Sequence, residues 1–167
     1  MTIAEYDHLD VDKKKKLLLQ CCGSGNWVEK MLQVPPAEDL VDLFEEAEEM
    51  WYQCSEADWK EAFTHHPRIG DMESLRKKFS ADQFAENEQA SVSGASQQVL
   101  QQLSDSNKLY EQKFGYIFIV CATGKSAAEM LELLSARLQN DPAEEIKIAM
   151  EEQNRITRLR LEKMLDS

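Results

Sequence analysis

The residues best suited to chemistry lie in one short segment, His66-Pro67-Arg68-Ile69-Gly70-Asp71. Histidine is the side chain whose ordinary pKa lies closest to neutral pH, so His66 is a candidate for moving a proton. Pro67 disfavours helical backbone in the residue before it, so the segment is predicted to be a loop between two helices. Functional side chains are often found on such loops. Spacing alone nevertheless favours a simpler interpretation, a solvated turn in which Asp71 caps the following helix.

Glu88 and Arg160 carry charges that suit a site, but neither is distinctive by itself. Glu88 is followed by Gln89 in a polar stretch, and such a pair usually lies on a surface. Arg160 lies near the end of the chain, where an arginine normally complements the dipole at the C-terminus of a helix. Taken singly, neither residue indicates a function.

A phosphate-binding loop is the first alternative chemistry. Thr123-Gly124-Lys125-Ser126 follows an apolar run and precedes a helical pattern, as such a loop would. The motif also needs a glycine five residues before the Gly-Lys pair, and Ile119 occupies that position. We therefore expect an ordinary helix N-terminus here, capped by Thr123 or Ser126.

Metal and thiol chemistry are also disfavoured by spacing. His65 and His66 are adjacent, and no His-x-x-x-His or Cys-x-x-Cys pattern supports them, so we expect no metal site. The four cysteines are Cys21, Cys22, Cys54 and Cys121. They are expected to be reduced, buried thiols, as in a cytosolic protein. Cys121 lies in the most apolar run of the chain, which indicates core packing rather than a nucleophile.

Composition limits the class of protein. The chain has 167 residues, of which 43% are hydrophobic and 30% charged, and this predicts a single globular domain over residues 1–167. A net charge of −12 disfavours nucleic acid and anionic membranes as partners. Residues 1–10 show no signal-peptide pattern, and no apolar run approaches the ~20 residues that span a bilayer, so a cytoplasmic location is expected.

Helical patterns dominate the elements that would position these residues. The expected helices run from Asp10 or Asp12 to near Gly23, around Trp27–Leu32, over Ala37–Cys54, from Ser55 to near His65, over Met72–Phe79, through a long helix ending at Phe114, over Ser126–Leu138, and from Asp141 to about Leu165. The polar stretch 80–96 is expected to separate two of them. A single strand would have no partner, so Tyr116–Ala122 is predicted to be a buried extended or helical segment. The fold class is therefore all-α, a compact bundle of about eight helices.

Several segments match recurring motifs of one family. Residues 66–71 read His-Pro-Arg-Ile-Gly-Asp, residues 88–90 read Glu-Gln-Ala, and residues 114–119 read Phe-Gly-Tyr-Ile-Phe-Ile. In this order they resemble the H-P-R-I-G-D, E-Q-A-G and F-G-(aromatic)-x-F-I elements of the 2-oxo-4-hydroxy-4-carboxy-5-ureidoimidazoline (OHCU) decarboxylases. Residues 137–140 and 156–165 resemble the last two helices of that family, so the likeness extends over nearly the whole chain.

The resemblance implies an all-α enzyme, usually a homodimer, that removes CO2 from OHCU to give (S)-allantoin in urate degradation, a part of purine catabolism. Such an enzyme is a carboxy-lyase that works without metal or organic cofactor on a small ureide substrate. The resemblance implies that His66 and Glu88 form the catalytic acid–base pair and that Arg160 binds the substrate. The residues that it places around the substrate are Pro67, Gln89, Phe118, Ile119, Val120, Cys121 and Ala122.

These residue types suit the implied reaction. Loss of CO2 leaves an electron pair on a ring carbon, so an enzyme must hold the carboxylate, stabilise the developing charge and deliver a proton to one face. Histidine can polarise a hydroxyl or carboxylate, and a glutamate bonded to it can set its tautomer or raise its pKa. Arginine offers a planar fork to a carboxylate or a ureido oxygen.

Two features depart from the family pattern. Ser91 stands where the family often has glycine after E-Q-A, and the last four residues, Met164 to Ser167, lack the Ser-Lys-Leu peroxisomal signal, which fits a cytosolic form. The alternative function is a helical interaction module that kept the fold and lost the chemistry. Such a module predicts no CO2 release and no site that unites His66, Glu88 and Arg160.

Overall fold

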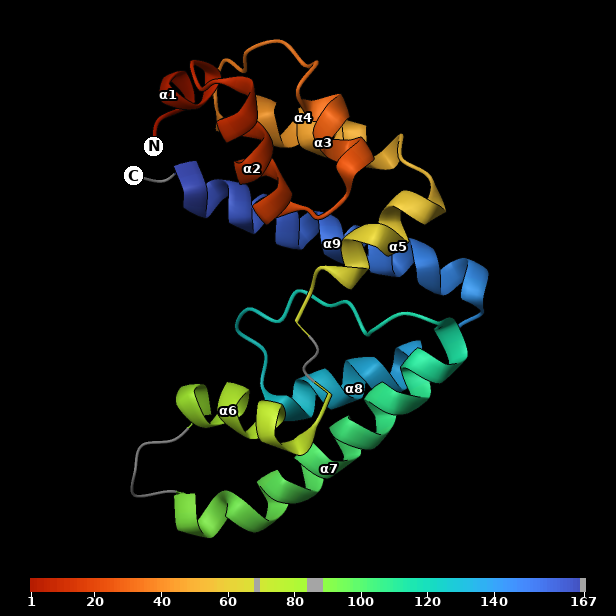
Figure 1. Ribbon diagram of the computed structural model, residues 1–167. Helices are drawn as coiled ribbons and strands as arrows, with labels where there is room; N and C mark the ends of the chain where they lie inside the picture. The colour runs from red at the N-terminus through yellow and green to blue at the C-terminus, as the bar shows by residue number, and fades with distance from the viewer. Residues whose placement is uncertain (68–69, 84–88, 166–167) are drawn as a thin grey trace. The chain divides into compact units, whose positions relative to one another are not determined.

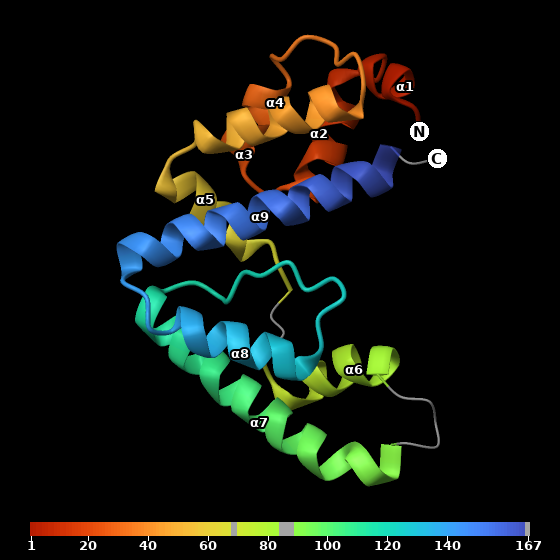
Figure 2. The same ribbon diagram turned by 180° about the vertical axis from the view of Figure 1, so that it is seen from behind.

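The computed structural model describes residues 1–67, 70–83 and 89–165, and within these ranges the side chains of all but residues 80–96. Over these ranges the chain forms nine α-helices and no β-strand (Figure 1; Figure 2 gives the reverse view). The all-α class predicted from the sequence is confirmed, with nine described helices against about eight expected.

The chain divides into two compact units. Unit 1 comprises Met1–His66, Ile119–Cys121 and Ile146–Ser167, and unit 2 comprises Pro67–Phe118 and Ala122–Glu145. Unit 1 contains α1 (Ile3–Asp7), α2 (Val11–Cys21), α3 (Gly25–Met31), α4 (Leu40–Tyr52), α5 (Glu56–Thr64) and most of α9 (Pro142–Leu165). Unit 2 contains α6 (Met72–Gln83), α7 (Gln89–Phe114), α8 (Ala127–Arg137) and the first turn of α9.

Short polar side chains start most of these helices where the sequence predicted. Asp10 accepts a hydrogen bond from the Lys13 amide at the start of α2, over 2.9 Å. Ser55 and Asp58 form a reciprocal capping box at the start of α5. Asp71 accepts from the Ser74 amide at 2.7 Å, and Ser126 caps α8. These caps satisfy backbone donors that have no partner within the helix.

The helical elements differ from the prediction at three places. The helix expected over Ala37–Cys54 is α4, which begins at Leu40 after the cap Asp39 and ends at Tyr52. The N-terminal residues form the short helix α1, which Thr2 begins with a capping box and whose Tyr6 is buried. The stretch 80–96 was expected to be a polar connection, yet α6 continues to Gln83 and α7 already begins at Gln89. Neither extension carries a clear apolar stripe, and helical periodicity is read mainly from that stripe.

Two tryptophans connect the helices of unit 1 through both packing and hydrogen bonds. Trp27 on α3 donates its indole N–H to the Ala47 carbonyl of α4 over 3.0 Å. Trp51 on α4 donates its indole N–H to the Met150 carbonyl of α9 over 2.7 Å. Both indoles are buried, so each adds a large apolar area while keeping its polar atom satisfied. The Trp27 bond thus joins α3 to α4, and the Trp51 bond joins α4 to α9.

The segment Tyr116–Ala122 is neither helix nor strand. It follows Gly115, which ends α7 with φ of 82°, a left-handed conformation that glycine adopts without strain. The sequence left both extended and helical backbone open for this segment, and the helical alternative is wrong. Tyr116 and Ile119 are the buried side chains of this run, and the others are half-buried, so it is less buried than its composition predicted.

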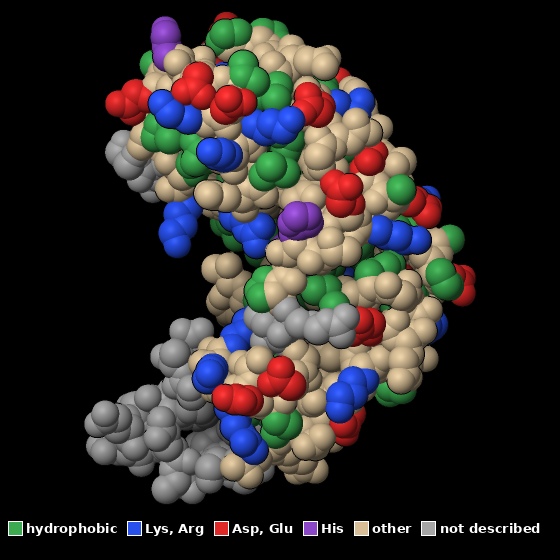
Figure 3. Space-filling model, viewed as in Figure 1, with side chains coloured by type: hydrophobic (Ala, Val, Ile, Leu, Met, Phe, Trp, Pro, Cys, Tyr) green, Lys and Arg blue, Asp and Glu red, His purple; other side chains and the backbone are tan. Residues whose placement is uncertain are grey.

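The visible surface mixes charges of both signs. On the face drawn in Figure 3, Lys and Arg side chains are interspersed with Asp and Glu side chains. A nucleic-acid-binding face usually carries a continuous basic stripe instead. Along the described ranges, no helix combines the length and the apolar composition that crossing a bilayer requires.

Candidate active site

His66 is the second residue after the end of α5, in unit 1. His65 ends the helix as its C-cap, and the His66 amide still donates to the Phe63 carbonyl over 3.4 Å. The ring of His66 is half-buried, and its Nε2 lies 2.5 Å from Oε1 of Gln153 on α9. The predicted loop residue is therefore held against a rigid helix rather than left in solvent, which contradicts the solvated-turn interpretation for this side chain.

One face of α9 carries the polar groups near this histidine. Gln153, Thr157 and Arg160 are spaced by four and three residues, so they share a face of the helix. Nε2 of Gln153 donates to Oγ1 of Thr157 over 3.1 Å, and both side chains are buried, 0% and 3% exposed. Buried polar groups of this kind are stable only when they are hydrogen-bonded to one another.

Arg160 lies where α9 meets the C-terminal end of α2. Its Nη1 donates to the carbonyls of Gln20 and Cys21 over 3.4 and 3.3 Å. These carbonyls belong to the last turn of α2, whose partial negative charge favours a cation. Because both bonds are long and come from one nitrogen, the guanidinium keeps the capacity to bind an anion as well.

The environment of His66 favours the neutral imidazole. Burial lowers its pKa below the ordinary value of 6.5, and the positive charge of Arg160 and the neighbouring His65 lower it further. The hydrogen bond to Gln153 acts in the opposite direction and raises the pKa. Burial is the largest of these effects, so the pKa of His66 lies below its ordinary value and the neutral form is favoured.

This pKa shift predicts a pH dependence of stability. Since folding lowers the pKa of His66, the unfolded chain binds more protons than the folded protein just below pH 6.5. The free energy of unfolding therefore loses a contribution as the pH falls from 6.5 toward the folded-state pKa. We expect the urea midpoint of the wild-type protein to fall more steeply than that of His66→Asn between about pH 7 and pH 5. Equal slopes for the two proteins would contradict the shift.

Gly23 makes room for the residue beside His66. A Cβ built on Gly23 would lie 2.6 Å from Cβ of His65, a contact that side-chain rotation cannot relieve. We expect Gly23→Ala to lower the free energy of unfolding by about 1–3 kcal/mol, because Cβ of His65 can move away only if the backbone moves with it. Urea unfolding measures this. Gly25→Ala is the matched control, because its Cβ would lie 3.6 Å from the nearest atom, Oε1 of Glu61. An equal loss in both variants would contradict the role given to Gly23.

The other predicted site residues are distributed over both units. Pro67 is exposed and belongs to unit 2, and Gln89 is the first residue of α7. Glu88 lies outside the described residues. Phe118 and Ala122 are half-buried in unit 2, whereas Ile119 is buried in unit 1, where Val120 and Cys121 are half-buried. Within unit 1 the structure thus brings His66 and Arg160 into one electrostatic environment.

Three of the four cysteines are buried free thiols, as the sequence predicted. Cys21, Cys22 and Cys54 are buried free thiols, and burial raises their pKa to about 11, 12 and 11. They are therefore neutral at physiological pH and poor nucleophiles. Cys121 is half-buried rather than part of the core, so the predicted core position is wrong for this residue. In the described ranges, no three His, Cys, Asp or Glu side chains gather closely enough to hold a metal ion.

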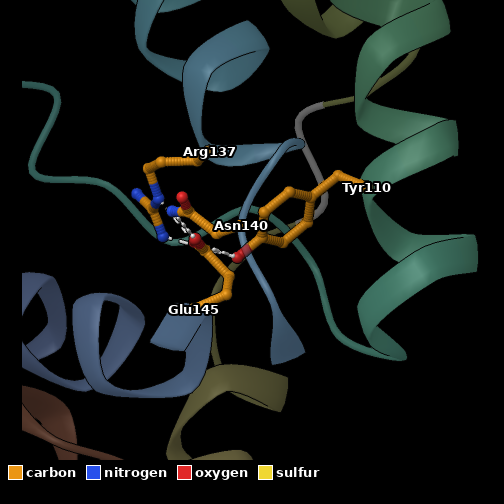
Figure 4. Close-up of polar contacts among 4 residues, drawn as sticks. All are labelled: Tyr110, Arg137, Asn140 and Glu145. Carbon is orange, nitrogen blue, oxygen red and sulfur yellow. Dashed lines mark hydrogen bonds and ion pairs between the residues drawn. The ribbon is translucent and has the colours of Figure 1, made fainter. Parts of the chain in front are cut away.

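Unit 2 contains a buried ionic cluster that the sequence patterns did not indicate (Figure 4). Oε1 of Glu145 accepts from Nε of Arg137 over 2.5 Å and from the hydroxyl of Tyr110 over 2.8 Å. Oε2 of Glu145 accepts from Nδ2 of Asn140 over 3.0 Å. The guanidinium of Arg137 also lies 4.5 Å from the centre of the Phe118 ring. The partners come from α7, α8, the connection between α8 and α9, and the first turn of α9, so the cluster is a structural brace of this unit.

Gln153 and Thr157 are the polar site residues that sequence reasoning missed. Each is a neutral residue on a helix rich in charged ones, and neither type is distinctive alone. The available signal was their spacing from Arg160, which places all three on one face of the predicted final helix. The buried neighbours Ala149 and Leu161 show that this face points into unit 1.

Comparison with known proteins identifies the family. The family model for OHCU decarboxylase matches residues 7–162, so the chain belongs to the OHCU decarboxylase family. The chain is 38% identical over 147 residues to the uric acid degradation bifunctional protein TTL of Arabidopsis thaliana, covering 86% of this chain and 45% of that protein. It is 30% identical over 100 residues to the 2-oxo-4-hydroxy-4-carboxy-5-ureidoimidazoline decarboxylase of Amia calva, covering 60% and 57%. The chain thus spans about half the length of these curated relatives.

Solved structures support the same fold. A crystal structure of OHCU decarboxylase in the presence of (S)-allantoin aligns with a TM-score of 0.72 and 36% identity, covering 89% of this chain and 96% of that one. A crystal structure of (S)-allantoin synthase aligns with a TM-score of 0.70 at 16% identity, which bears on the fold alone. The family resemblance drawn from the motifs is confirmed.

Proposed function

We propose that this chain catalyses the decarboxylation of OHCU to (S)-allantoin in urate degradation, as a carboxy-lyase. The observation that carries the proposal is geometric: inside unit 1 the half-buried imidazole of His66 contacts Gln153 on α9, and Arg160 lies on the same face of that helix. Membership of the OHCU decarboxylase family and a related crystal structure determined in the presence of (S)-allantoin support the substrate class. A neutral base beside a cation suits an anionic substrate that must exchange a proton.

The reaction assigns a distinct task to each group. The Arg160 guanidinium binds the carboxylate or a ureido oxygen of the substrate, in geometry that its planar fork favours. His66, neutral before the reaction, accepts a hydrogen bond or a proton from the substrate hydroxyl as the bond to CO2 breaks. The electron pair left on the carbon that carried the carboxylate is delocalised into the neighbouring imine and on to the ring carbonyl. The deprotonated hydroxyl oxygen on that carbon becomes the new carbonyl of allantoin, and one proton is delivered to the adjacent ring carbon, which bears the ureido group.

The remaining assignments follow the family motifs. Glu88 is proposed as the acid–base partner of His66, and the residues proposed to line the substrate are Pro67, Gln89, Phe118, Ile119, Val120, Cys121 and Ala122. We further propose that residues 1–167 act as one domain, since the family model runs through both units. We also propose that the protein is a homodimer, that it is cytoplasmic and that it needs no cofactor.

The experiment that tests the activity generates OHCU in situ from urate with urate oxidase and hydroxyisourate hydrolase. Loss of the substrate is followed by 13C NMR, together with release of CO2, with and without this protein. The proposal predicts that the protein accelerates both signals in proportion to its concentration. Rates equal to those of the uncatalysed reaction would reject the enzyme and leave the helical interaction module as the function of this fold.

Substitution of the substrate-binding arginine provides a sharper test. We expect Arg160→Lys to raise KM about tenfold or more with a smaller change in kcat, because a planar fork becomes a single point charge. Steady-state kinetics with OHCU measure both constants. Arg158→Lys is the matched control, since Arg158 lies on the same helix with its guanidinium over the Phe44 ring at 4.8 Å. A KM for Arg160→Lys no higher than that of the control would contradict substrate binding by Arg160.

A further inference from the structure

We propose that Gln153 is a positioning residue that fixes His66 as the tautomer protonated on Nε2, leaving the lone pair on Nδ1 as the basic site. This proposal rests on the proposed function only for its consequence in catalysis. The tautomer itself is a property of the unliganded protein and can be tested without substrate.

The direction of the hydrogen bonds follows from the neighbours of the Gln153 amide. Its Nε2 donates to Oγ1 of Thr157 over 3.1 Å, one turn further along α9. The hydroxyl of Thr157 in turn acts on the thiol of Cys22, the C-cap residue of α2, and lowers the pKa of that thiol, which burial raises. With the amide nitrogen occupied in this way, Oε1 is the atom that faces His66, at 2.5 Å from Nε2.

An amide oxygen can only accept a hydrogen bond, so the nitrogen opposite it must carry the proton. Gln153 is 0% exposed, and water cannot replace the histidine as its partner without opening the core. A neutral His66 protonated on Nδ1 would place two lone pairs against each other in that environment. Burial therefore turns an ordinary hydrogen bond into a strong preference for one tautomer.

Gln153 also offsets part of the shift caused by burial. Burial lowers the pKa of the imidazole most, and among the described residues Arg160 on α9 and the neighbouring His65 lower it further. The hydrogen bond to Gln153 is the contribution that raises it. A neutral acceptor at position 153 thus keeps His66 basic enough to take a proton without holding it permanently charged.

Two substitutions of similar length separate positioning from mere packing. Gln153→Met removes the acceptor and should shift the acid limb of the kcat/KM profile to lower pH. Gln153→Glu adds a negative charge and should shift that limb to higher pH. The expected order of the apparent pKa is Met, then Gln, then Glu. Asn154→Met is the matched control, because Asn154 bonds to Glu48 over 2.9 Å on the same helix and should leave the profile unchanged.

The decisive measurement is 15N NMR of protein labelled at histidine, recorded without substrate at a pH where His66 is neutral. The protein has three histidines, so comparison with His66→Asn assigns the signals. In wild type and Asn154→Met we expect a pyrrole-type Nε2 and a pyridine-type Nδ1, and in Gln153→Met an averaged pattern of both tautomers. Circular dichroism verifies that each variant is folded, and Thr157→Val, which releases the amide nitrogen, should change the pattern in the same direction if Gln153→Met does not fold.

The outcomes for the tautomer and for the activity are separable. A wild-type signal with the proton on Nδ1, or a pattern unchanged in folded Gln153→Met, would overturn the role of Gln153 whatever the enzyme does. A protein that does not accelerate OHCU loss but shows the Nε2–H tautomer would reject the proposed function while supporting the positioning of His66. An unchanged pH profile in active Gln153→Met and Gln153→Glu would likewise overturn the proposal.

Discussion

Replacing His66 with asparagine is expected to lower kcat for OHCU decarboxylation by about 10²- to 10⁴-fold, the usual contribution of a positioned acid–base group. Asparagine can still bond to Gln153 through its amide, but it cannot take up a proton near neutral pH. The kcat of the variant and of the wild type should be compared at saturating OHCU generated in situ. Because the imidazole lies at the end of α5 rather than inside a helix, the helical circular dichroism should be preserved.

His8→Asn provides the matched control for this loss. It also removes one imidazole, but the ring of His8 lies 2.6 Å from the Ala4 carbonyl of the short helix α1. Its activity should equal that of the wild type. If His66→Asn were folded and retained wild-type kcat, His66 would not be a catalytic residue, and loss of helical signal in His66→Asn would show that its role is structural.

Removing the cation of the buried cluster is expected to have the largest effect on stability. Arg137→Met leaves the carboxylate of Glu145, which is 0% exposed, without its charged partner. Such a loss costs about 3–5 kcal/mol, or about 6–20 °C in the melting temperature for a chain of this size. The brace joins the ends of α7, α8 and the start of α9, so unit 2 should unfold first. Thermal and urea unfolding of the purified variant measure the effect.

A second ion pair of the same chain gives the comparison. Nζ of Lys15 lies 2.6 Å from Oε1 of Glu29, but both side chains are about half exposed, 47% and 54%. Lys15→Met should cost less than about 1 kcal/mol, since solvent screens an exposed pair. Adding Glu145→Leu to Arg137→Met should recover part of the loss, because the unpaired carboxylate disappears. Equal costs for Arg137→Met and Lys15→Met would contradict the brace.

The helix boundaries were predictable because particular residue types begin and end helices. Asp10, Ser55 and Ser126 each cap a helix at the position that their sequence context indicates. Pro67 correctly predicted the end of α5 before the catalytic candidate. The start of α7 was missed because residues 89–96 are mainly small and polar, and helix formation there follows from continuity with the later turns rather than from an apolar stripe.

Site residues could be predicted from the sequence only where they belong to a family motif. His66 and Arg160 were found from the family motifs, while Gln153 was not, because a buried amide has the same sequence signal as an exposed one. The burial of Arg137 was missed for a similar reason. Arg137 is buried at the end of α8 because Glu145 lies across the following turn and satisfies its charge. Such pairings depend on tertiary structure.

The handedness of the product tests the central claim most directly. Protonation of a planar intermediate in water proceeds from both faces, so uncatalysed OHCU decay yields racemic allantoin, whereas a site that holds the substrate delivers the proton to one face. With OHCU generated in situ, we expect the wild-type protein to produce the circular dichroism of (S)-allantoin, and His66→Asn to produce none beyond the racemic background. Racemic allantoin from the folded wild-type protein would contradict the account.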